Sequence, residues 1–115
     1  MSVSPYPLWS PDRELLASRD RGTGEWVFPA VAQTSPLAAL HETVAIDGDG
    51  VLYSFTVIHP SAKSGQSPYA LGYVDFPGPV RIFGRLQGSE RPVIGERYRP
   101  RVDESFGYVF GAVAS

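Results

Sequence analysis

Three stretches decide the fold of this chain: VLYSFTVIHP (residues 51–60), YALGYVDF (69–76) and VRIFGRLQG (80–88). They are rich in β-branched and aromatic residues, which favour strands. In the third stretch the residues alternate between two faces, as they do in a strand with one buried side. The apolar face would carry Val80, Ile82 and Leu86, and the opposite face Arg81, Phe83 and Arg85. We therefore predict three consecutive strands, the last two joined by the Pro-Gly-Pro turn at 77–79.

The same pattern extends on both sides of these stretches. ETVAI (42–46) predicts a strand before them, and GERYRPRVDE (95–104) and FGYVFGAVA (106–114) predict strands after them. Pro100 favours an edge position or a break in its strand. DGDG (47–50) is typical of a turn, since it lacks the further oxygen ligands of a calcium loop. Short strands with glycine-rich turns and almost no helix after residue 42 predict a small β-barrel or sandwich. Glycines inside strand patterns would mark its bends: Gly72, Gly84, Gly107 and Gly111.

The N-terminal third has a different character. Residues 1–11 contain three prolines and predict an extended arm. DRELLASR (12–19) predicts a short helix, with Pro11 near its first position. RDRGTGEWVFPA (19–30) predicts a tight glycine turn and a short strand, arranged like a metal-binding knuckle. AQTSPLAALHET (32–43) predicts a loop or one helical turn.

Length and composition narrow the class of protein. A chain of 115 residues is the size of one ordinary domain, and the absence of cysteine excludes disulfides and thiolate metal sites. The N-terminus has no cationic region followed by an apolar run, and no apolar run approaches the ~20 residues that span a bilayer. We expect a soluble, cytoplasmic protein.

Positive charge is concentrated in one region. Residues 81–101 hold six arginines and two glutamates, a net charge of +4, whereas the rest of the chain holds four basic and ten acidic residues, a net charge of −6. Such a local excess suits a compact anionic ligand or partner. If the arginines of two strands meet, they could bind phosphates bidentately. The alternative is a solvated strand face. The predicted ligand-binding residues are Arg81, Phe83, Arg85, Arg97 and Arg99, with Arg101 beside them.

No catalytic group stands out. His59 follows a strong strand without a second catalytic group nearby, so a structural histidine at a strand end is favoured over a general base. No serine lies in a nucleophile elbow, and SAKSGQS (61–67) is not a phosphate loop. The fourteen aromatic residues could stack on single-stranded nucleic acid, but the chain is net acidic, which argues against that partner. We predict that the chain has no catalytic residues of its own.

Several motifs together resemble a known family, the acyl-CoA-associated proteins that combine a zinc ribbon with an OB-fold and were long described only as a domain of unknown function. The most specific motif is Gly-x-Gly-x-x-Tyr-Ser-Phe-Thr-Val at Gly48–Val57. Pro68-Tyr69 and Ile94-Gly95 follow it in the same order as in the family. The resemblance runs from about Leu8 to Val109. It implies a short helix, a rubredoxin-like ribbon and a five-stranded OB barrel. The domains expected are an arm (1–11), a helix and degenerate ribbon (12–43) and the barrel (44–115).

The resemblance also implies a function. With Phe28-Pro29 as the anchor, the family's four zinc cysteines correspond to Asp20, Thr23, Thr34 and Leu37, so the ribbon is expected to lack zinc and to be held by apolar packing of Trp26, Val27 and Phe28. Family members are small subunits of thiolase- or aldolase-type enzymes. The implied function is a non-catalytic accessory subunit that helps form an acyl-CoA site, with a coenzyme A thioester as ligand. The alternatives are a stand-alone OB module that binds a small ligand or single-stranded nucleic acid, and a homodimer with another role.

Overall fold

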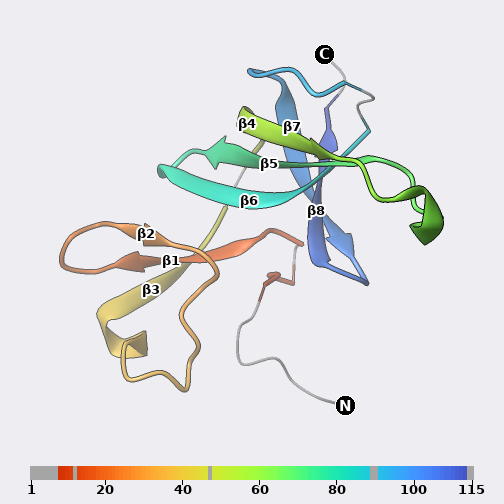
Figure 1. The fold of residues 1–115 in the computed structure, drawn as a ribbon. Coiled ribbons are helices and arrows are strands. Elements are labelled where there is room, and N and C mark those ends of the chain that lie inside the picture. The colour runs from red at the N-terminus through yellow and green to blue at the C-terminus, as the bar shows by residue number, and fades with distance from the viewer. Residues whose placement is uncertain (1–7, 12, 47, 89–90, 114–115) are drawn as a thin grey trace. The chain divides into compact units, whose positions relative to one another are not determined.

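The computed structural model describes residues 8–11, 13–46, 48–88 and 91–113 (Figure 1). The chain divides into two compact units. Residues 1–47 with 77–80 form the first, here called the ribbon unit, and residues 48–76 with 81–115 form the second, the barrel unit. No helix within the described ranges is long and apolar enough to cross a membrane.

The ribbon unit is built on a small antiparallel sheet in the order β2-β1-β3. Its strands are β1 (Leu16–Asp20), β2 (Trp26–Val27) and β3 (His41–Ala45). A short 3-10 helix, η1 (Ala38–Leu40), leads directly into β3. The glycine turn followed by a short strand, the single helical turn and the strand at ETVAI are therefore confirmed. β3 belongs to this unit, so the barrel unit begins a few residues after the boundary that we expected at residue 44.

The helix that we predicted over residues 12–19 is wrong for the described part of that range. Leu16–Asp20 forms the central strand β1, and Leu15 pairs with Trp9 in an isolated bridge. Leu15 and Ala17, two residues apart, are both fully buried, which is the period of a strand. The backbone N–H of Ser10 donates to the carbonyl of Glu14, closing a turn where a helix would have begun. Pairing with β3 along five residues outweighs the weak local preference for helix. Of the predicted arm, residues 8–10 take part in this pairing, and residues 1–7 lie outside the described residues.

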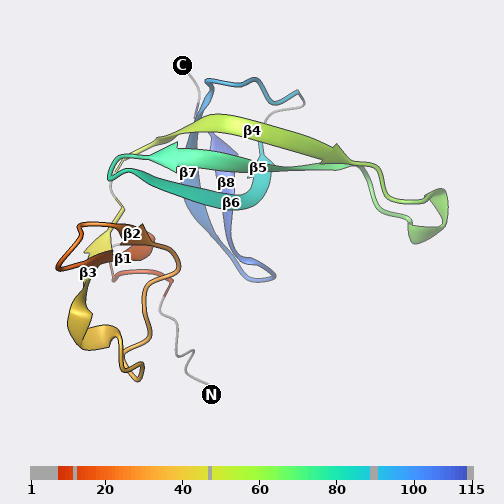
Figure 2. The ribbon, with the colours of Figure 1, turned by 60° about the vertical axis from the view of Figure 1, so that its left-hand side comes forward.

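The barrel unit contains five strands that close in the order β4-β5-β6-β8-β7. They are β4 (Gly50–Ile58), β5 (Tyr69–Phe76), β6 (Val80–Gln87), β7 (Arg97–Asp103) and β8 (Gly107–Ala112). β6 and β8 run parallel, whereas β4 pairs antiparallel with β5 and β7. This order is that of an OB-fold barrel, which confirms the predicted OB-fold and the five strands predicted from residue 51 onward. The β4–β5 hairpin extends beyond β6 and carries a second 3-10 helix, η2 (Ala62–Ser64) (Figure 2).

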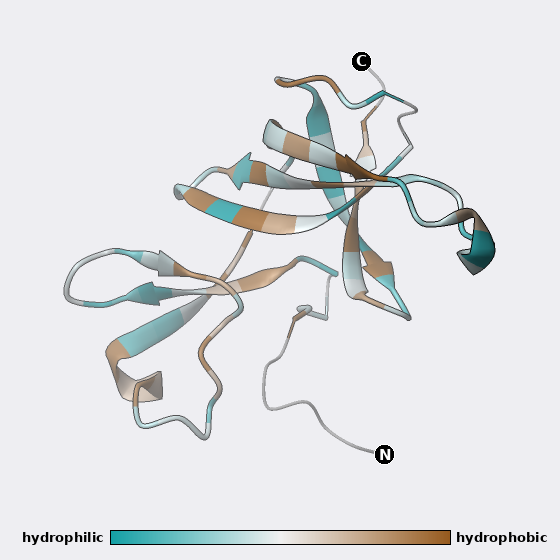
Figure 3. Ribbon diagram, in the orientation of Figure 1, coloured by the Kyte–Doolittle hydropathy of each residue, from teal (hydrophilic) through white to brown (hydrophobic). Residues whose placement is uncertain are grey.

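The core of the barrel follows the predicted alternation. Polar and apolar residues follow one another along β6 in Figure 3, and Ile82 and Leu86 are buried while Arg81 and Phe83 are exposed. Val80, the residue of β6 that the ribbon unit includes, is buried as well. Burying each large side chain contributes roughly 1.5 to 3 kcal/mol. The largest residues that are almost fully buried in this unit are Tyr98, Phe110, Leu52, Ile82 and Val74.

Two residues show how the barrel curls. A Cβ atom on Gly72 would lie 2.7 Å from the carbonyl oxygen of Ser54, so only glycine allows β5 to approach β4 there. Pro100 lies within β7 and pairs with Phe110 of β8. Among the described residues β4 pairs with β7 at Arg97 and Tyr98, so the missing N–H of Pro100 falls beyond that pairing. The expected edge position or break at Pro100 is thus seen as the end of the pairing between β4 and β7, whereas the pairing with β8 continues.

Candidate ligand pocket on the barrel

A pocket of about 430 Å³ opens on the barrel unit between β5, β6, β8 and two loops. Gln66 comes from the β4–β5 connection and Phe106 from the β7–β8 turn. Its lining includes Gln66, Tyr69, Phe83, Arg85, Phe106 and Tyr108. OB-folds bind their ligands on the face of their second and third strands, between the loops that join strands 1–2 and 4–5. In this chain those elements are β5, β6 and the loops that carry Gln66 and Phe106, so the pocket occupies the usual ligand face.

Arg85 is the cation of this pocket. Its guanidinium carbon lies 4.4 Å from the centroid of the Tyr69 ring and 5.2 Å from that of Phe106. Both distances allow a cation–π interaction, which Arg makes more often than Lys. The side chain is half-buried, and within the described residues no carboxylate lies within salt-bridge distance of it. The aromatic rings therefore position a guanidinium whose charge is not neutralised by any described carboxylate.

Tyr108 forms the wall of the pocket beside β6. Its hydroxyl donates a hydrogen bond of 2.5 Å to the carbonyl of Phe83. Burial raises the pKa of Tyr108, so the hydroxyl stays protonated over the physiological range. A Cβ atom on Gly84 would lie 2.9 Å from the Tyr108 ring and 2.7 Å from Phe110, so glycine at this point of β6 allows both rings to approach. The close approach of these rings to β6 thus forms this wall of the pocket.

Arg81 precedes Arg85 on the same face of β6, and its charge is neutralised by an ion pair with Asp75. Its guanidinium binds Asp75 of β5 bidentately, with Nε 2.6 Å from Oδ1 and Nη2 3.1 Å from Oδ2. Its carbon also lies 3.5 Å from the centroid of the Tyr53 ring. The hydrogen bond to Asp75 raises the pKa of Arg81 further above its ordinary value. Arg81 is therefore occupied by its neighbours and does not share the pocket with Arg85.

The other predicted arginines lie on β7. β8 separates β7 from β6, so the two backbones are about 10 Å apart, two strand spacings. Arg99 donates from Nε to Oδ1 of Asp49 at 2.9 Å, which neutralises it. Arg97 and Arg101 are exposed, and the Arg101 side chain lies against Gly111. The structure thus brings Phe83 and Arg85 together in the pocket and places Arg81, Arg97 and Arg99 elsewhere.

Comparison with known proteins places this barrel in a family. The model of the ChsH2 C-terminal OB-fold domain matches residues 43–103, more than half of the chain. The chain belongs to the ChsH2 C-terminal OB-fold family. A chain of the solved Ltp2-ChsH2(DUF35) aldolase superposes with a TM-score of 0.68 over 90% of this chain and 87% of that one, at 22% sequence identity, which shows a shared fold.

A curated relative is similar over a shorter stretch. The benzoylsuccinyl-CoA thiolase subunit BbsA of Thauera aromatica is 38% identical over 48 residues, or 42% of this chain. The match spans only a third of the length of BbsA.

Of the residues that line the pocket, sequence reasoning predicted only Phe83 and Arg85 as ligand-binding residues. Gln66, Phe106 and Tyr108 were not singled out, and Tyr69 was named only as a marker of the family, because these residues lie on different elements from the arginines. The strand assignment of an OB-fold would have predicted where these residues lie. In such a fold the ligand face is formed by the second and third strands and by the loops before the second and fifth strands. Aromatic residues at those positions then point to a pocket.

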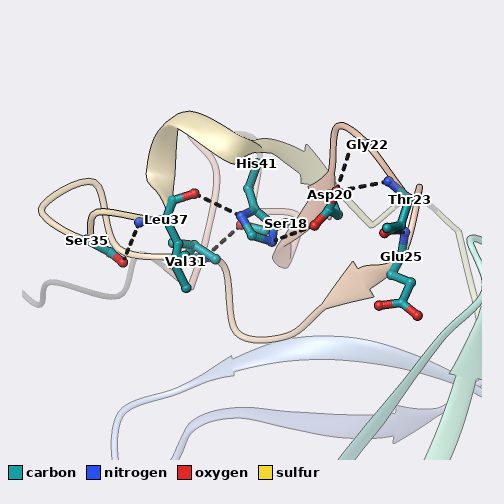
Figure 4. A network of polar contacts seen from close by, with 9 residues as sticks. All are labelled: Ser18, Asp20, Gly22, Thr23, Glu25, Val31, Ser35, Leu37 and His41. Carbon is teal, nitrogen blue, oxygen red and sulfur yellow. Dashed lines mark hydrogen bonds and ion pairs between the residues drawn. The ribbon is translucent and has the colours of Figure 1, made fainter.

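Three of the four degenerate zinc positions, Asp20, Thr23 and Leu37, lie in a network of polar contacts in the ribbon unit (Figure 4). Asp20 ends β1, and its Oδ1 accepts hydrogen bonds from the backbone N–H groups of Thr23 at 2.9 Å and Gly22 at 2.7 Å. These bonds, first that of Thr23, lower the pKa of Asp20. Gly24 closes the turn with a φ of 78°, a conformation that favours glycine, and its N–H donates to the Asp20 carbonyl.

His41 joins this turn to the second degenerate pair. Its Nδ1 donates to the carbonyl of Leu37 at 2.9 Å, and its Nε2 lies 3.8 Å from Oδ2 of Asp20, an ion pair when the imidazole is protonated. Through these two contacts, His41 connects the two segments at which the family resemblance placed zinc ligands.

These positions do not fit a zinc ion. Structural zinc sites use four Cys, His or carboxylate ligands, and Thr23, Thr34 and Leu37 supply none of these. The carboxylate of Asp20 is already engaged by two N–H groups and faces His41. Over the described residues no group of three His, Cys, Asp or Glu side chains is arranged to hold a metal. Of the three residues from which we expected apolar packing, Trp26 and Phe28 are half-buried, and the Trp26 ring lies against Gly78, whereas Val27 is 41% exposed.

Proposed function

We propose that this protein is a non-catalytic accessory subunit of an acyl-CoA-metabolising enzyme of the thiolase or aldolase type. The observation that carries the proposal is the membership of its barrel in the ChsH2 C-terminal OB-fold family. The similarity to a thiolase subunit, BbsA, points to the same class of assembly. The subunit would bind a catalytic chain and help to form or support its acyl-CoA site, with a coenzyme A thioester as the ligand of the complex.

The outer face of β4, β5 and β6 is the surface best suited to such a partner. Four large apolar or aromatic side chains on it are 44–53% exposed: Val51, Tyr53, Tyr73 and Phe83. Tyr73 and Phe83 also contact each other, with ring centroids 5.0 Å apart. Exposed clusters of this kind mark interaction surfaces, and aromatic residues are enriched at the centres of interfaces. Arg97 and Arg101 on β7 supply exposed positive charge for coenzyme A phosphates.

Affinity purification of the tagged protein from its native host, followed by mass spectrometry, tests the proposal. The expected result is a thiolase- or aldolase-like chain in fixed stoichiometry. A Tyr73→Asp variant should lose this chain, because a charge on the outer face would be buried unpaired in the interface. The matched control is Val102→Asp, which places the same charge at a side chain of β7 that is 51% exposed and should retain the partner.

A protein that elutes alone, and whose melting temperature no acyl-CoA changes, would contradict the proposal. Elution as a homodimer without a second chain would favour a role independent of a catalytic partner.

A further inference from the structure

We propose that the pocket around Arg85 is a binding site for a small organic anion with a flat apolar body, such as an aryl carboxylate. The anionic group would bind the Arg85 guanidinium, and the apolar body would lie against the aromatic rings. The proposal concerns the barrel unit alone. It does not depend on the accessory role proposed above.

The size and lining of the pocket set the class of ligand. A volume of about 430 Å³ falls in the lower half of the range of roughly 300 to 1,000 Å³ that is typical of small-molecule sites. Aromatic rings from three strands and a turn surround it, namely those of Tyr69, Phe83, Phe106 and Tyr108. Flat apolar groups stack well on such rings. A small planar molecule therefore fits better than a long flexible one.

The positive charge of Arg85 determines that the ligand is an anion. Arg81 and Arg99 each bind a carboxylate of the protein, at 2.6 and 2.9 Å, whereas no described carboxylate lies within salt-bridge distance of Arg85. Among the described residues that line the pocket there is no Asp or Glu. Contacts with Tyr69 and Phe106 restrict the guanidinium plane, and a planar guanidinium can donate two parallel hydrogen bonds to a carboxylate or phosphate. The pocket is thus pre-organised for an anion.

Single-stranded nucleic acid is the other ligand that this face of an OB-fold can bind. Such proteins combine stacking rings with a cationic groove that follows several phosphates. Here one arginine lines the pocket, its nearest neighbour on the strand face is neutralised by Asp75, and the net charge of the chain is −2. These charges favour one small anion over a polyanion.

Titration of the full chain with phenylacetate, followed by NMR of its backbone amides, tests the proposal. Phenylacetate should shift the amides of Gly84, Arg85 and Tyr108 saturably. 2-Phenylethanol, which has nearly the same shape without the charge, should bind at least about tenfold more weakly, because it lacks the charge-assisted hydrogen bonds to Arg85. Inorganic phosphate, which has charge without the apolar body, should also bind weakly.

Three variants locate the site. Arg85→Gln should reduce the affinity for phenylacetate at least about tenfold, to that of the alcohol, and leave the affinity for the alcohol unchanged. Arg97→Gln removes the same charge from an exposed position on β7 and should change neither affinity. Phe106→Ala, at a turn residue that is 56% exposed, should reduce the affinity for both ligands. It provides a second test if Arg85→Gln does not fold.

Several results would overturn the proposal. They are the absence of saturable shifts at millimolar phenylacetate, equal affinity for the alcohol, and unchanged binding by Arg85→Gln. Tighter binding of oligo-dT with a steep salt dependence would also overturn it, by assigning the face to nucleic acid. Because no partner is present in the titration, this test and the affinity purification can fail independently of each other.

Discussion

The ribbon unit and the barrel unit are stabilised by different means. The barrel unit buries large side chains, among them Tyr98, Phe110 and Ile82. The ribbon unit buries mainly small ones, such as Ala17, Ala30 and Ala32, beside Leu15 and Ile46. In their place it has a series of side chain-to-backbone hydrogen bonds around Ser18, Asp20 and His41. Since apolar burial scales with area, the barrel should dominate the stability and the ribbon should depend on individual polar groups.

The largest effect is expected from a cavity in the barrel. Phe110 is fully buried and contacts the rings of Phe76 and Tyr108, with centroids 5.7 and 5.5 Å away. Phe110→Ala should lower the free energy of unfolding by about 3 to 5 kcal/mol, because it removes buried area and leaves a void. Chemical denaturation measures this change. Phe106→Ala, an exposed phenylalanine of the same unit, is the control and should change stability by far less. Similar losses for the two variants would show that the barrel core does not dominate.

A smaller and more local effect is expected from Ser18. Its side chain is 1% exposed, and its Oγ accepts the N–H of Val31 at 2.7 Å. Ser18→Ala leaves this N–H without an acceptor and should cost about 1 to 3 kcal/mol. Hydrogen exchange should report the loss at Val31 and in β1. Ser35→Ala removes an exposed hydroxyl that accepts a hydrogen bond from the N–H of Leu37, and it should lower the free energy of unfolding by less. Equal effects would contradict a special role for the buried serine.

Asp20 should affect the ribbon turn without a large change in the barrel. Asp20→Ala removes the acceptor of two N–H groups, so the amides of Gly22 and Thr23 should exchange faster. Asp20→Asn keeps an acceptor oxygen and removes the charge, so it should retain part of that protection. If Asn and Ala behave alike, the charge of Asp20 is what holds the turn.

The pH dependence of this turn follows from the lowered pKa of Asp20. A carboxyl whose pKa is lower in the folded chain stabilises it fully above the unfolded pKa of about 3.9. The contribution is lost as the pH falls through the lower folded value. The Gly22 and Thr23 amide resonances should therefore shift below about pH 4 in the wild type and stay constant in Asp20→Asn. A shift in both would assign the transition to another group.

The smallest effect is expected from metal removal. A chelator should leave the melting temperature unchanged, because Asp20, Thr23, Thr34 and Leu37 do not form a zinc site. Thermal denaturation with and without chelator is the measurement. A lower melting temperature with chelator would show that the ribbon is held by metal and would remove the contrast between the two units.

The barrel strands were determined by the sequence alone. Alternating apolar residues and glycine- or proline-rich turns occur at the right spacing, so β4 to β8 could be predicted closely from local patterns. The secondary structure of the N-terminal third could be predicted less well from the sequence. β1 is short, and the strand with which it pairs, β3, lies more than twenty residues later in the chain. A local preference does not contain that information.

The site shows the same division. The sequence determined that Arg81, Phe83 and Arg85 share one face of a strand, because side chains alternate along any strand. Only the tertiary structure decided which arginine keeps its charge available. Asp75 neutralises Arg81 across a hairpin, and Asp49 neutralises Arg99 from a turn 50 residues away, while Tyr69 and Phe106 reach Arg85 from a neighbouring strand and a distant turn. Charge pairing and stacking depend on distances of a few ångströms, which strand pairing and barrel closure set and local sequence does not.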